Sequence, residues 1–374
     1  MEGRIWRDFN FFLLLCVLVL LSISLLSVYS ATLEAVTAFG TPLKVLFPRH
    51  IVNIAVGFVA MTAMMVLDYR TLSGIAGPLY LGTIVVLAGV LVIGEITSGA
   101  QSWIGVGTRT VQPSEFSKLT VIIVLAAYWS HFEDQGSRWL IQFGSLGIVG
   151  VPLLMVFLQP DFGTALVFGA IWLVMAWESG IRWQQLLFLL VLALPCFLVG
   201  WEYVLNDEQR SRLATFYWLI ANPAEVNADE AYNIIQSLNA IRSGGLFGTG
   251  LTRGILSQGN YIPVQYSDFI FAVIGEEMGF AGGAMLLVLL ALLLWMVLSI
   301  ASRARDRFGR LIAVGIFGMI LSHVVVNIGV TMSIMPVTGI PLPFISYGGS
   351  FTIMILAAMG LLQSISMHWR KIVF

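Results

Sequence analysis

The chain carries little charge. Only 10% of its 374 residues are Asp, Glu, Lys or Arg, whereas soluble domains carry about 25%. Hydrophobic residues make up 58%, and apolar runs recur along nearly the whole length. These proportions exclude an ordinary soluble protein and indicate a single integral membrane domain over residues 1–374. The net charge of −1 argues against nucleic acid as a partner.

Cysteine and recognisable cofactor motifs are equally scarce. Cys16 and Cys196 both fall inside apolar runs, so the sequence has no disulfide framework and no zinc spacing. The glycine-rich run 243–250 lacks the Gly-Lys-Ser/Thr ending of a P-loop, and chemistry driven by ATP is not expected. The first apolar run, 9–29, is longer than the core of a signal peptide, which has about 7–15 residues, so we expect no cleavable signal.

Apolar segments long enough to cross about 30 Å of hydrocarbon occur about ten times. We expect spans near residues 9–30, 49–67, 72–94, 115–130, 141–158, 162–178, 184–204, 269–300, 311–330 and 344–367. The expected fold class is therefore an all-α polytopic membrane protein. One long loop, about 205–267, separates the seventh helix from the eighth.

Basic residues indicate the orientation of these spans. With the N-terminus inside, the inner segments hold most of the Lys and Arg outside the long loop, as the positive-inside rule requires. Both termini are then cytoplasmic, the long loop is extracytoplasmic, and Asp268 faces outward.

Four segments on this outer face hold most of the unusual polar chemistry. In the first, 99–118, glycines and a proline predict a loop, and Ser114 can cap a helix that begins near Glu115. Lys118 lies three residues after Glu115, so the two can pair on one helix face. This pair either serves a polar ligand or only fixes the position of its helix. Trp103 is either an interfacial belt residue or, because glycines flank it, part of a site.

The second and third segments add one carboxylate and several arginines. Asp161 stands in a Pro-Asp turn between two spans, which turn chemistry alone can explain. In the long loop, apolar residues at helical spacing predict a helix over 232–243. Arg210, Arg242 and Arg253 of the same loop are available to an anionic group.

The fourth segment, 335–350, includes Ser346 and is rich in proline and glycine, which forbids a regular helix up to about residue 343. Non-helical backbone at this depth is tolerated only where protein or water covers it. Together the four segments predict an outward-facing cavity that handles a polar ligand at the membrane surface.

The stretch 261–279 closes the long loop and leads directly into an apolar run. It contains Asp268, and a carboxylate near hydrocarbon costs roughly 2.5–3.5 kcal/mol on insertion scales, which makes it a candidate functional group. The alternative is that Asp268 or Ser267 caps the helix that follows, because both residue types are preferred there.

These segments resemble the SEDS family of membrane proteins (shape, elongation, division and sporulation). The matching stretches are 99–118, with Ala-Gln-Ser-Trp-Ile and Gln-Pro-Ser-Glu-Phe-Ser-Lys, then 159–164, 235–250, 267–279 and 341–350. With the expected spans, the resemblance covers essentially the full length. The loop 258–265 and the short N-terminal tail favour the elongation subgroup over the division subgroup.

The resemblance implies a peptidoglycan glycosyltransferase of the bacterial cytoplasmic (inner) membrane, which polymerises lipid II at the outer face for cell elongation and shape. Its expected partners are lipid II, membrane lipid and a class B penicillin-binding protein, which crosslinks the strand. Asp268 matches the family's essential acidic residue, Trp103 its loop tryptophan, and Glu115 and Lys118 its polar pair.

The residues suit this chemistry. Asp268 is the candidate general base for an inverting transfer, because an apolar flank would raise its pKa toward the working pH. Lys118 is the candidate cation for the substrate diphosphate. The other substrate-binding candidates are Trp103, Glu115, Arg109, Asp161, Arg210, Arg253 and Ser346. No cofactor is assigned. A divalent cation could assist, although the sequence shows no metal-ligand cluster of recognisable spacing.

Two other functions fit parts of the sequence. A lipid II flippase would also have many spans with charges among them, but here the charges gather at one face, and inverted repeats, the usual mark of a transporter, are not apparent. A non-catalytic scaffold for the penicillin-binding protein would leave the polar outer loops unexplained. We therefore favour the enzyme.

Overall fold

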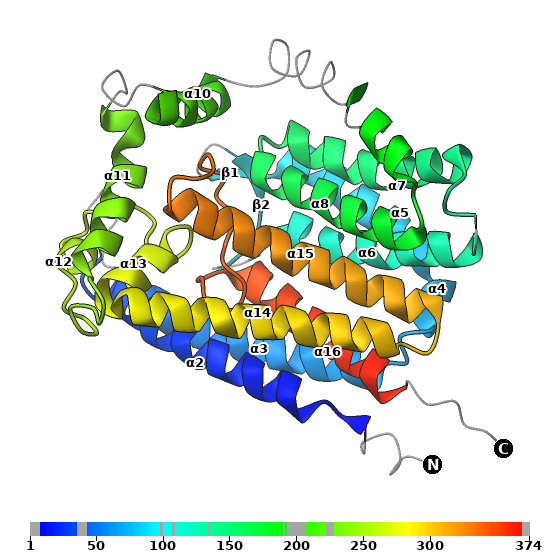
Figure 1. Ribbon diagram of the computed structural model, residues 1–374, viewed down its shortest axis with the longest axis horizontal. Helices are drawn as coiled ribbons and strands as arrows, with labels where there is room; N and C mark the ends of the chain where they lie inside the picture. Colours follow the sequence, from blue (N-terminus) through cyan, green and yellow to red (C-terminus); the bar gives the residue numbers. More distant parts are fainter. Residues whose placement is uncertain are drawn as a thin grey trace.

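The computed structural model describes residues 8–35, 43–97, 100–106, 109–133, 135–189, 191–192, 207–221 and 228–368. Long helices running side by side form the body of the molecule, and two helices of the long loop, α10 (Asp207–Ala221) and α11 (Ala228–Ser243), lie at its periphery (Figure 1).

The long helices of the described residues are α2 (Phe11–Leu33), α3 (Leu46–Val66), α5 (Ala76–Ile93), α6 (Pro113–His131), α7 (Trp139–Leu158), α8 (Phe162–Ser179), α14 (Gly279–Arg303), α15 (Arg307–Thr331) and α16 (Gly349–Met367). The short ones are the 3-10 helix η2 (Leu43–Val45), α4 (Thr71–Gly74), α12 (Ile255–Gln258) and α13 (Ile270–Glu277).

Among the described residues, eight helices are long and apolar enough to cross a membrane. They include every long helix except α6, which is less apolar and packs inside the bundle against α5, α7, α8, α15 and α16. The expected all-α polytopic fold is confirmed. The expected span 184–204 lies largely outside the described residues.

Polar residues begin and end several of these helices. The Asn10 side chain accepts a hydrogen bond from the Leu13 amide at the start of α2, and Asp306 accepts one from the Gly309 amide at the start of α15. Such caps satisfy amides that have no partner within the helix. These two helices therefore start directly after a short polar residue.

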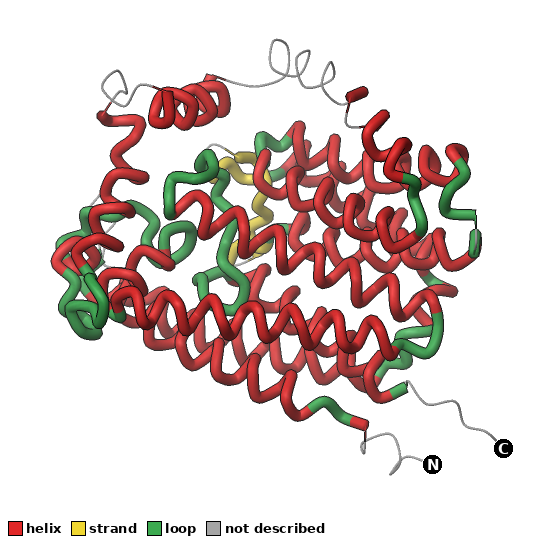
Figure 2. Tube along the Cα trace, in the orientation of Figure 1, coloured by secondary structure: helices red, strands yellow, loops and turns green. Residues whose placement is uncertain are grey.

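The expectation of a simple loop over 99–111 was wrong. This region forms most of a three-stranded antiparallel sheet in the order β1-β2-β3, with β1 at Glu95–Thr97, β2 at Ala100–Val106 and β3 at Arg109–Val111. Trp103 pairs with Glu95, and Ile104 pairs with Val111. The many glycines obscured β-branched residues that favour strands. The strands lie next to the non-helical chain before α16 (Figure 2).

The expected single span 269–300 is two helices, α13 and α14, which meet at Met278 and Gly279. Gly279 has a φ of +67°, and a Cβ there would overlap the backbone at Gly248. The Phe280 amide donates to the Gly245 carbonyl at 2.9 Å. The glycine-rich run 243–250 is therefore a packing surface for the α13–α14 junction, and its glycines permit this close approach.

Helices α3 and α16 approach one another closely at a glycine. A Cβ at Gly360 of α16 would overlap the carbonyl oxygen of Met61 in α3. Small residues at helix contacts are typical of membrane bundles, where packing rather than hydrophobicity drives association. Near the end of α16, the Gln363 side chain exchanges two hydrogen bonds with the backbone of Asn10, so α2 begins where α16 ends.

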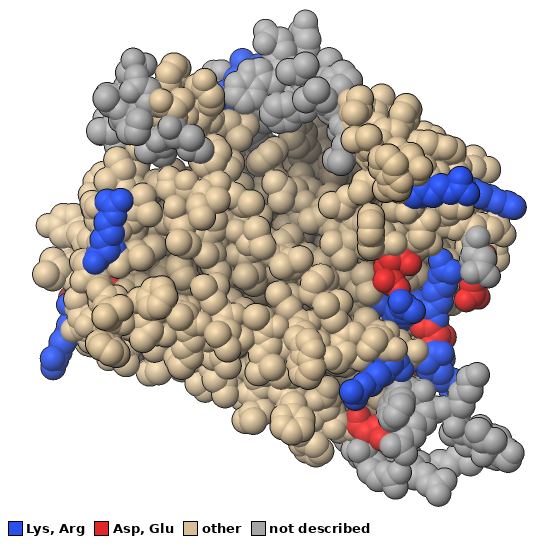
Figure 3. Space-filling view, viewed as in Figure 1, with Lys and Arg blue, Asp and Glu red and all other residues tan. Residues whose placement is uncertain are grey.

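Charged side chains gather at the end of the molecule where α14 meets α15, and the broad face beside it shows few of them (Figure 3). We call this the charged end. Arg70 pairs there with Asp306, and Arg310 pairs with Glu178. Asp268 lies beyond the other end of α14, whose 25 residues span about 38 Å at 1.5 Å per residue. We call that the Asp268 end.

The two ends should lie on opposite sides of the membrane. In a protein whose Cys16 and Cys196 are replaced by serine, a cysteine at the exposed position Tyr217 should react with an impermeant thiol reagent added outside intact cells. A cysteine at the exposed position Arg305 should react only after the membrane is opened, because basic residues favour the inner side. The reverse labelling pattern would contradict this orientation.

Candidate active site

Asp268 stands in the turn that leads into α13. Its amide donates to the Val264 carbonyl at 3.2 Å, and the Ser267 hydroxyl donates to its Oδ1 at 2.8 Å. The other carboxylate oxygen faces Gly339, where a Cβ would stand 3.7 Å away. The side chain is partly buried. Asp268 is thus placed by the chain on both sides of it and faces a segment that comes from before α16.

The capping explanation for Asp268 is wrong. The N-cap of α13 is Phe269, and within the described part of the chain no side chain bonds to the first amides of that helix. Ser114 likewise does not cap α6, since that helix begins at Pro113 with Gln112 as its N-cap. In both cases the helix begins one or two residues away from the position that a cap would need. The cost of holding Asp268 near hydrocarbon therefore has no capping benefit to offset it.

Burial raises the pKa of the Asp268 carboxyl above its ordinary value, because desolvation disfavours the charged form. The hydrogen bond from Ser267 and the charge of Arg212 oppose this shift. A carboxylate whose pKa is moved toward neutrality is a better proton acceptor near pH 7 than an ordinary aspartate. The environment is therefore that of a candidate general base.

The segment 335–348 has no helix. The sequence predicted this up to about residue 343, but α16 begins at Gly349 and not near residue 344. The segment is tied to Asp268 from the other side. The Ser346 hydroxyl donates to the Ser267 carbonyl at 2.6 Å and accepts from the Leu342 amide at 2.8 Å. The Tyr347 amide donates to the Tyr266 carbonyl at 2.9 Å. Because Ser346 is buried and already has two protein partners, its geometry favours holding this segment over direct contact with a ligand.

Glu115 and Lys118 form the pair that their spacing predicted. Their Oε2 and Nζ atoms lie 2.8 Å apart, and both side chains are almost fully buried. Lys118 Nζ also lies 3.1 Å from Nε2 of His323 and 5.5 Å from the ring centre of Phe351. A lysine is rarely buried so completely without a functional or pairing requirement. The α6 face therefore presents a fixed cation beside α15 and α16.

Asp161 is held in the same region by two bonds. Its Oδ1 accepts from the Thr164 amide at 3.0 Å and so caps α8, and its Oδ2 accepts from the Gln112 side chain at 3.0 Å. The Gln112 amide donates to the Ser350 hydroxyl at the start of α16. Asp161 is also close enough to Glu115 for the two charges to interact. Asp161 therefore caps α8, as a turn residue can, and through Gln112 it connects α8 with the sheet and α16.

The remaining predicted site residues have these positions. Trp103 is partly buried in β2, Arg109 is the first residue of β3, Arg210 lies partly buried on α10, and Arg253 is exposed in the turn before α12. No contact joins Trp103 or Arg253 to Asp268 among those described here. Their assignment to a ligand stays a prediction.

Three residues near the site were not identified from sequence. Arg212 lies on α10, two residues after Arg210, and its charge acts on Asp268. His323 and Asn327 of α15 bond to Lys118 and to the backbone of Asp268. The last two are polar residues four apart in an apolar run, which places them on one helix face, and this signal could have been found.

The two glutamates after Asp268 have structural partners. The Glu276 carboxylate accepts from the Leu256 and Ser257 amides at 2.8 and 2.9 Å, at the start of α12. Glu277 accepts from the hydroxyl of Ser30 in α2 and from the Gln258 side chain. They fix the loop before Asp268 to α13 and α2, which makes them supports of the site.

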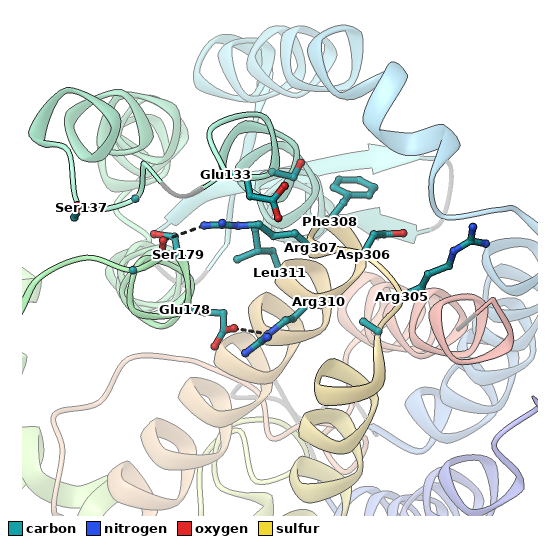
Figure 4. A pocket seen from close by; sticks show the side chains of 14 residues that line it. Glu133, Ser137, Glu178, Ser179, Arg305, Asp306, Arg307, Phe308, Arg310 and Leu311 are labelled. Carbon is teal, nitrogen blue, oxygen red and sulfur yellow. Dashed lines mark hydrogen bonds and ion pairs between the residues drawn. The ribbon is translucent and has the colours of Figure 1, made fainter. Parts of the chain in front are cut away.

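A cavity of about 790 Å³ opens at the charged end, between α8, α15 and the chain after α6 (Figure 4). Its charges largely have partners within the protein. Arg310 pairs with Glu178, and Arg307 donates to the Ser179 carbonyl at 3.0 Å. These contacts join α8 to α15. The cavity lies a helix length away from Asp268, so we place the candidate active site at the Asp268 end.

Comparison with known proteins identifies the family. The family model described as cell cycle protein, which covers FtsW, RodA and SpoVE, matches residues 11–371. The chain belongs to this family. The resemblance to the SEDS proteins, the same group, is confirmed.

Individual SEDS proteins match over almost the full length. Stage V sporulation protein E of Bacillus subtilis (strain 168) is 38% identical over 361 residues, which cover 96% of this chain and 97% of that protein. Peptidoglycan glycosyltransferase MrdB of Escherichia coli (strain K12) is 36% identical over 361 residues, 96% of this chain and 94% of its own. A solved structure of a peptidoglycan synthase complex that coordinates polymerization and crosslinking superposes with a TM-score of 0.81 at 29% identity, covering 96% of this chain and 97% of that one.

Exchanging Glu115 and Lys118 should not restore function. In the double variant Glu115→Lys, Lys118→Glu, a carboxylate would face the His323 nitrogen that now accepts from Lys118, and two acceptors cannot bond to one another. We expect polymer synthesis from lipid II to stay as low as in either single variant, with melting temperature as the folding control. Recovery of synthesis in the exchange would show that only a helix-fixing pair is needed.

The charge of Arg212 should affect the pH at which kcat/KM for lipid II falls on the acid side. Its positive charge lowers the pKa of Asp268, so Arg212→Gln should let that pKa rise further. The acid limb of kcat/KM for lipid II should then move to higher pH, because the base is protonated earlier as pH falls. The exposed Arg242→Gln, on α11 of the same loop, should leave the limb in place. An unchanged limb in the Arg212 variant would contradict the assignment of Asp268 as base.

Proposed function

We propose that this chain is a peptidoglycan glycosyltransferase that polymerises lipid II into glycan strands at the outer face of the bacterial cytoplasmic membrane. The observation that carries the proposal is that a candidate base and a candidate cation are connected to one another at the Asp268 end. A partly buried carboxylate with a raised pKa and a buried lysine are joined through one non-helical segment. Full-length relatives that are named peptidoglycan glycosyltransferases support the same activity.

The reaction needs a base, a cation and a groove for the lipid. Asp268 takes the proton from the attacking sugar hydroxyl, whose oxygen forms the new glycosidic bond as the bond from sugar to diphosphate breaks. Inversion at the sugar carbon follows from this single displacement. The diphosphate leaves with its negative charge, so no acid is required to protonate it. A fixed cation in a low-dielectric site stabilises the charge that develops there, and we assign this task to Lys118, whose Nζ lies beside Glu115 and His323.

The rest of the substrate falls to the surrounding outer segments. Glu115 pairs with Lys118, and Asp161 accepts a hydrogen bond from Gln112, just before α6. To these two we add, as substrate-binding candidates, Trp103 of β2, Arg109 of β3, Arg210 of α10 and Arg253. Within the described ranges no three His, Cys, Asp or Glu side chains come together as a metal site.

A class B penicillin-binding protein is the proposed partner, and cell elongation and shape the proposed role. The structural match to a complex that coordinates polymerization and crosslinking supports the partner. We infer from the basic residues of the charged end that both termini lie in the cytoplasm. In this orientation the polymerising site would lie on the side where a crosslinking partner receives the strand.

Replacing the Asp268 carboxylate by an amide tests the proposal. Asp268→Asn keeps the size of the side chain but cannot accept the proton, and general base catalysis contributes about 10²–10⁴-fold. Purified protein in lipid nanodiscs, supplied with lipid II with and without its partner, should therefore make about 1% of the normal polymer or less on a glycan gel. Melting temperature and partner binding should be unchanged.

A control of the same chemistry lies at the charged end. Asp68→Asn changes an aspartate between α3 and α4, far from the site, and should polymerise normally. Near-normal synthesis by Asp268→Asn would end the catalytic assignment. A flippase predicts instead that the unmutated protein moves lipid II between leaflets and makes no polymer.

A further inference from the structure

Two of the buried polar side chains of helix α15, His323 and Asn327, bond to the segments that form the site. His323 and Asn327 are one helical turn apart, so they share a face, and their exposed fractions are 1% and 2%. A polar group among membrane helices costs free energy unless it is bonded. Both side chains bond to other segments of the chain, and these bonds lead to the two groups that the reaction needs.

The partners of His323 define the protonation of its ring. Nδ1 lies 3.0 Å from the Pro341 carbonyl, which can only accept, so Nδ1 carries the proton. Nε2 lies 3.1 Å from Nζ of Lys118, and an ammonium can only donate, so Nε2 is the acceptor. The ring also stacks on Phe351, with centroids 4.6 Å apart. A neutral imidazole in a fixed orientation therefore connects Lys118 to the segment 335–348.

Asn327 makes the second connection. Its Nδ2 donates to the Asp268 carbonyl at 2.9 Å and to the Ile340 carbonyl at 2.8 Å. Both partners are carbonyls, so the nitrogen of the amide must face them. One side chain thus joins the backbone of Asp268 to the residue that precedes Pro341. The path from Lys118 to Asp268 runs through His323, two neighbouring residues of one segment and Asn327.

We propose that His323 and Asn327 are positioning residues, which fix Lys118 and Asp268 relative to one another through the segment 335–348. This inference rests on the proposed function. Neither residue needs to touch the substrate. His323 orients the Lys118 ammonium toward the substrate diphosphate. Asn327 fixes the position of the Asp268 carboxylate relative to the attacking hydroxyl.

Asn327 also satisfies backbone groups that would otherwise be unpaired. The carbonyls of Asp268 and Ile340 both accept from its Nδ2, and a buried carbonyl without a partner costs free energy. A test of positioning must therefore use kinetic constants, which a purely structural role would not separate.

Two substitutions at His323 separate the two connections. Asparagine places an N–H where Nδ1 stands and is too short to reach Lys118, so His323→Asn keeps the bond to Pro341 alone. Glutamine places an oxygen where Nε2 stands, so His323→Gln keeps the bond to Lys118 alone. Full-length protein in nanodiscs is assayed for lipid II polymerisation, and for binding of undecaprenyl diphosphate as a probe of the cation.

The two variants should differ in kind. Loss of a hydrogen bond to a charged group costs about tenfold or more, so His323→Asn should weaken undecaprenyl diphosphate binding about tenfold, raise KM and also lower kcat, because Lys118 meets the diphosphate both when the substrate binds and as charge develops on it in the transition state. Misplacement of a reacting group by about 1 Å can cost 10²-fold in rate, so His323→Gln should lower kcat at least tenfold while KM stays within about twofold. Ser322→Ala, whose hydroxyl bonds only to the neighbouring turn, should leave both constants unchanged.

The same changes of KM and kcat in both His323 variants, or constants equal to those of the unmutated protein, would overturn the inference. If His323→Gln does not fold, Asn327→Ala tests the same segment and should lower kcat with KM unchanged; a rise in KM alone would then contradict it. Failure of the proposed function is distinguishable, because the unmutated protein would then make no polymer and the inference would fall with it. If that protein polymerises and only the His323 pattern is absent, the inference alone fails.

Discussion

A stretch of non-helical chain lies inside a bundle of membrane helices, and its backbone must be satisfied by protein. Hydrocarbon offers no hydrogen bonds, so irregular backbone persists only where other groups cover it. In the segment 335–348, His323, Asn327 and Ser346 supply these bonds. The same side chains also reach Lys118, Asp268 and Ser267. The side chains that satisfy the backbone of this segment are therefore the same ones that position the reactive groups, and two of the three lie on α15.

The sequence predicted the parts of the fold that follow from local pattern. Long apolar runs became helices, proline and glycine kept the chain out of helix up to residue 343, and a spacing of three placed Glu115 against Lys118. It failed where distant segments decide the outcome. The α13–α14 break at Gly279 exists because the run 243–250 packs against it, and no local signal marks that contact. The small sheet was missed because glycine and β-branched residues alternate there.

The candidate site was predictable by residue type but not by role. Asp268 stood out as a carboxylate beside an apolar run, yet only the structure separates a cap from a candidate base, since the helix begins at Ile270. Ser346 was expected to bind substrate, and its hydroxyl is engaged by the protein. Arg212 could not be chosen over Arg210 from sequence, because two residues along a helix point in different directions and the fold alone decides which charge acts on Asp268.

This arrangement suits group transfer better than transport. A transporter alternates between two arrangements around a site near the middle of the membrane, which requires bonds that can be exchanged. Here, at the Asp268 end, each of His323, Asn327 and Ser346 joins two partners at once. Moving any one segment would break several of them together. A fixed base and a fixed cation are what a displacement at a sugar carbon requires, because the rate depends on holding the reacting groups within about 1 Å of their productive positions.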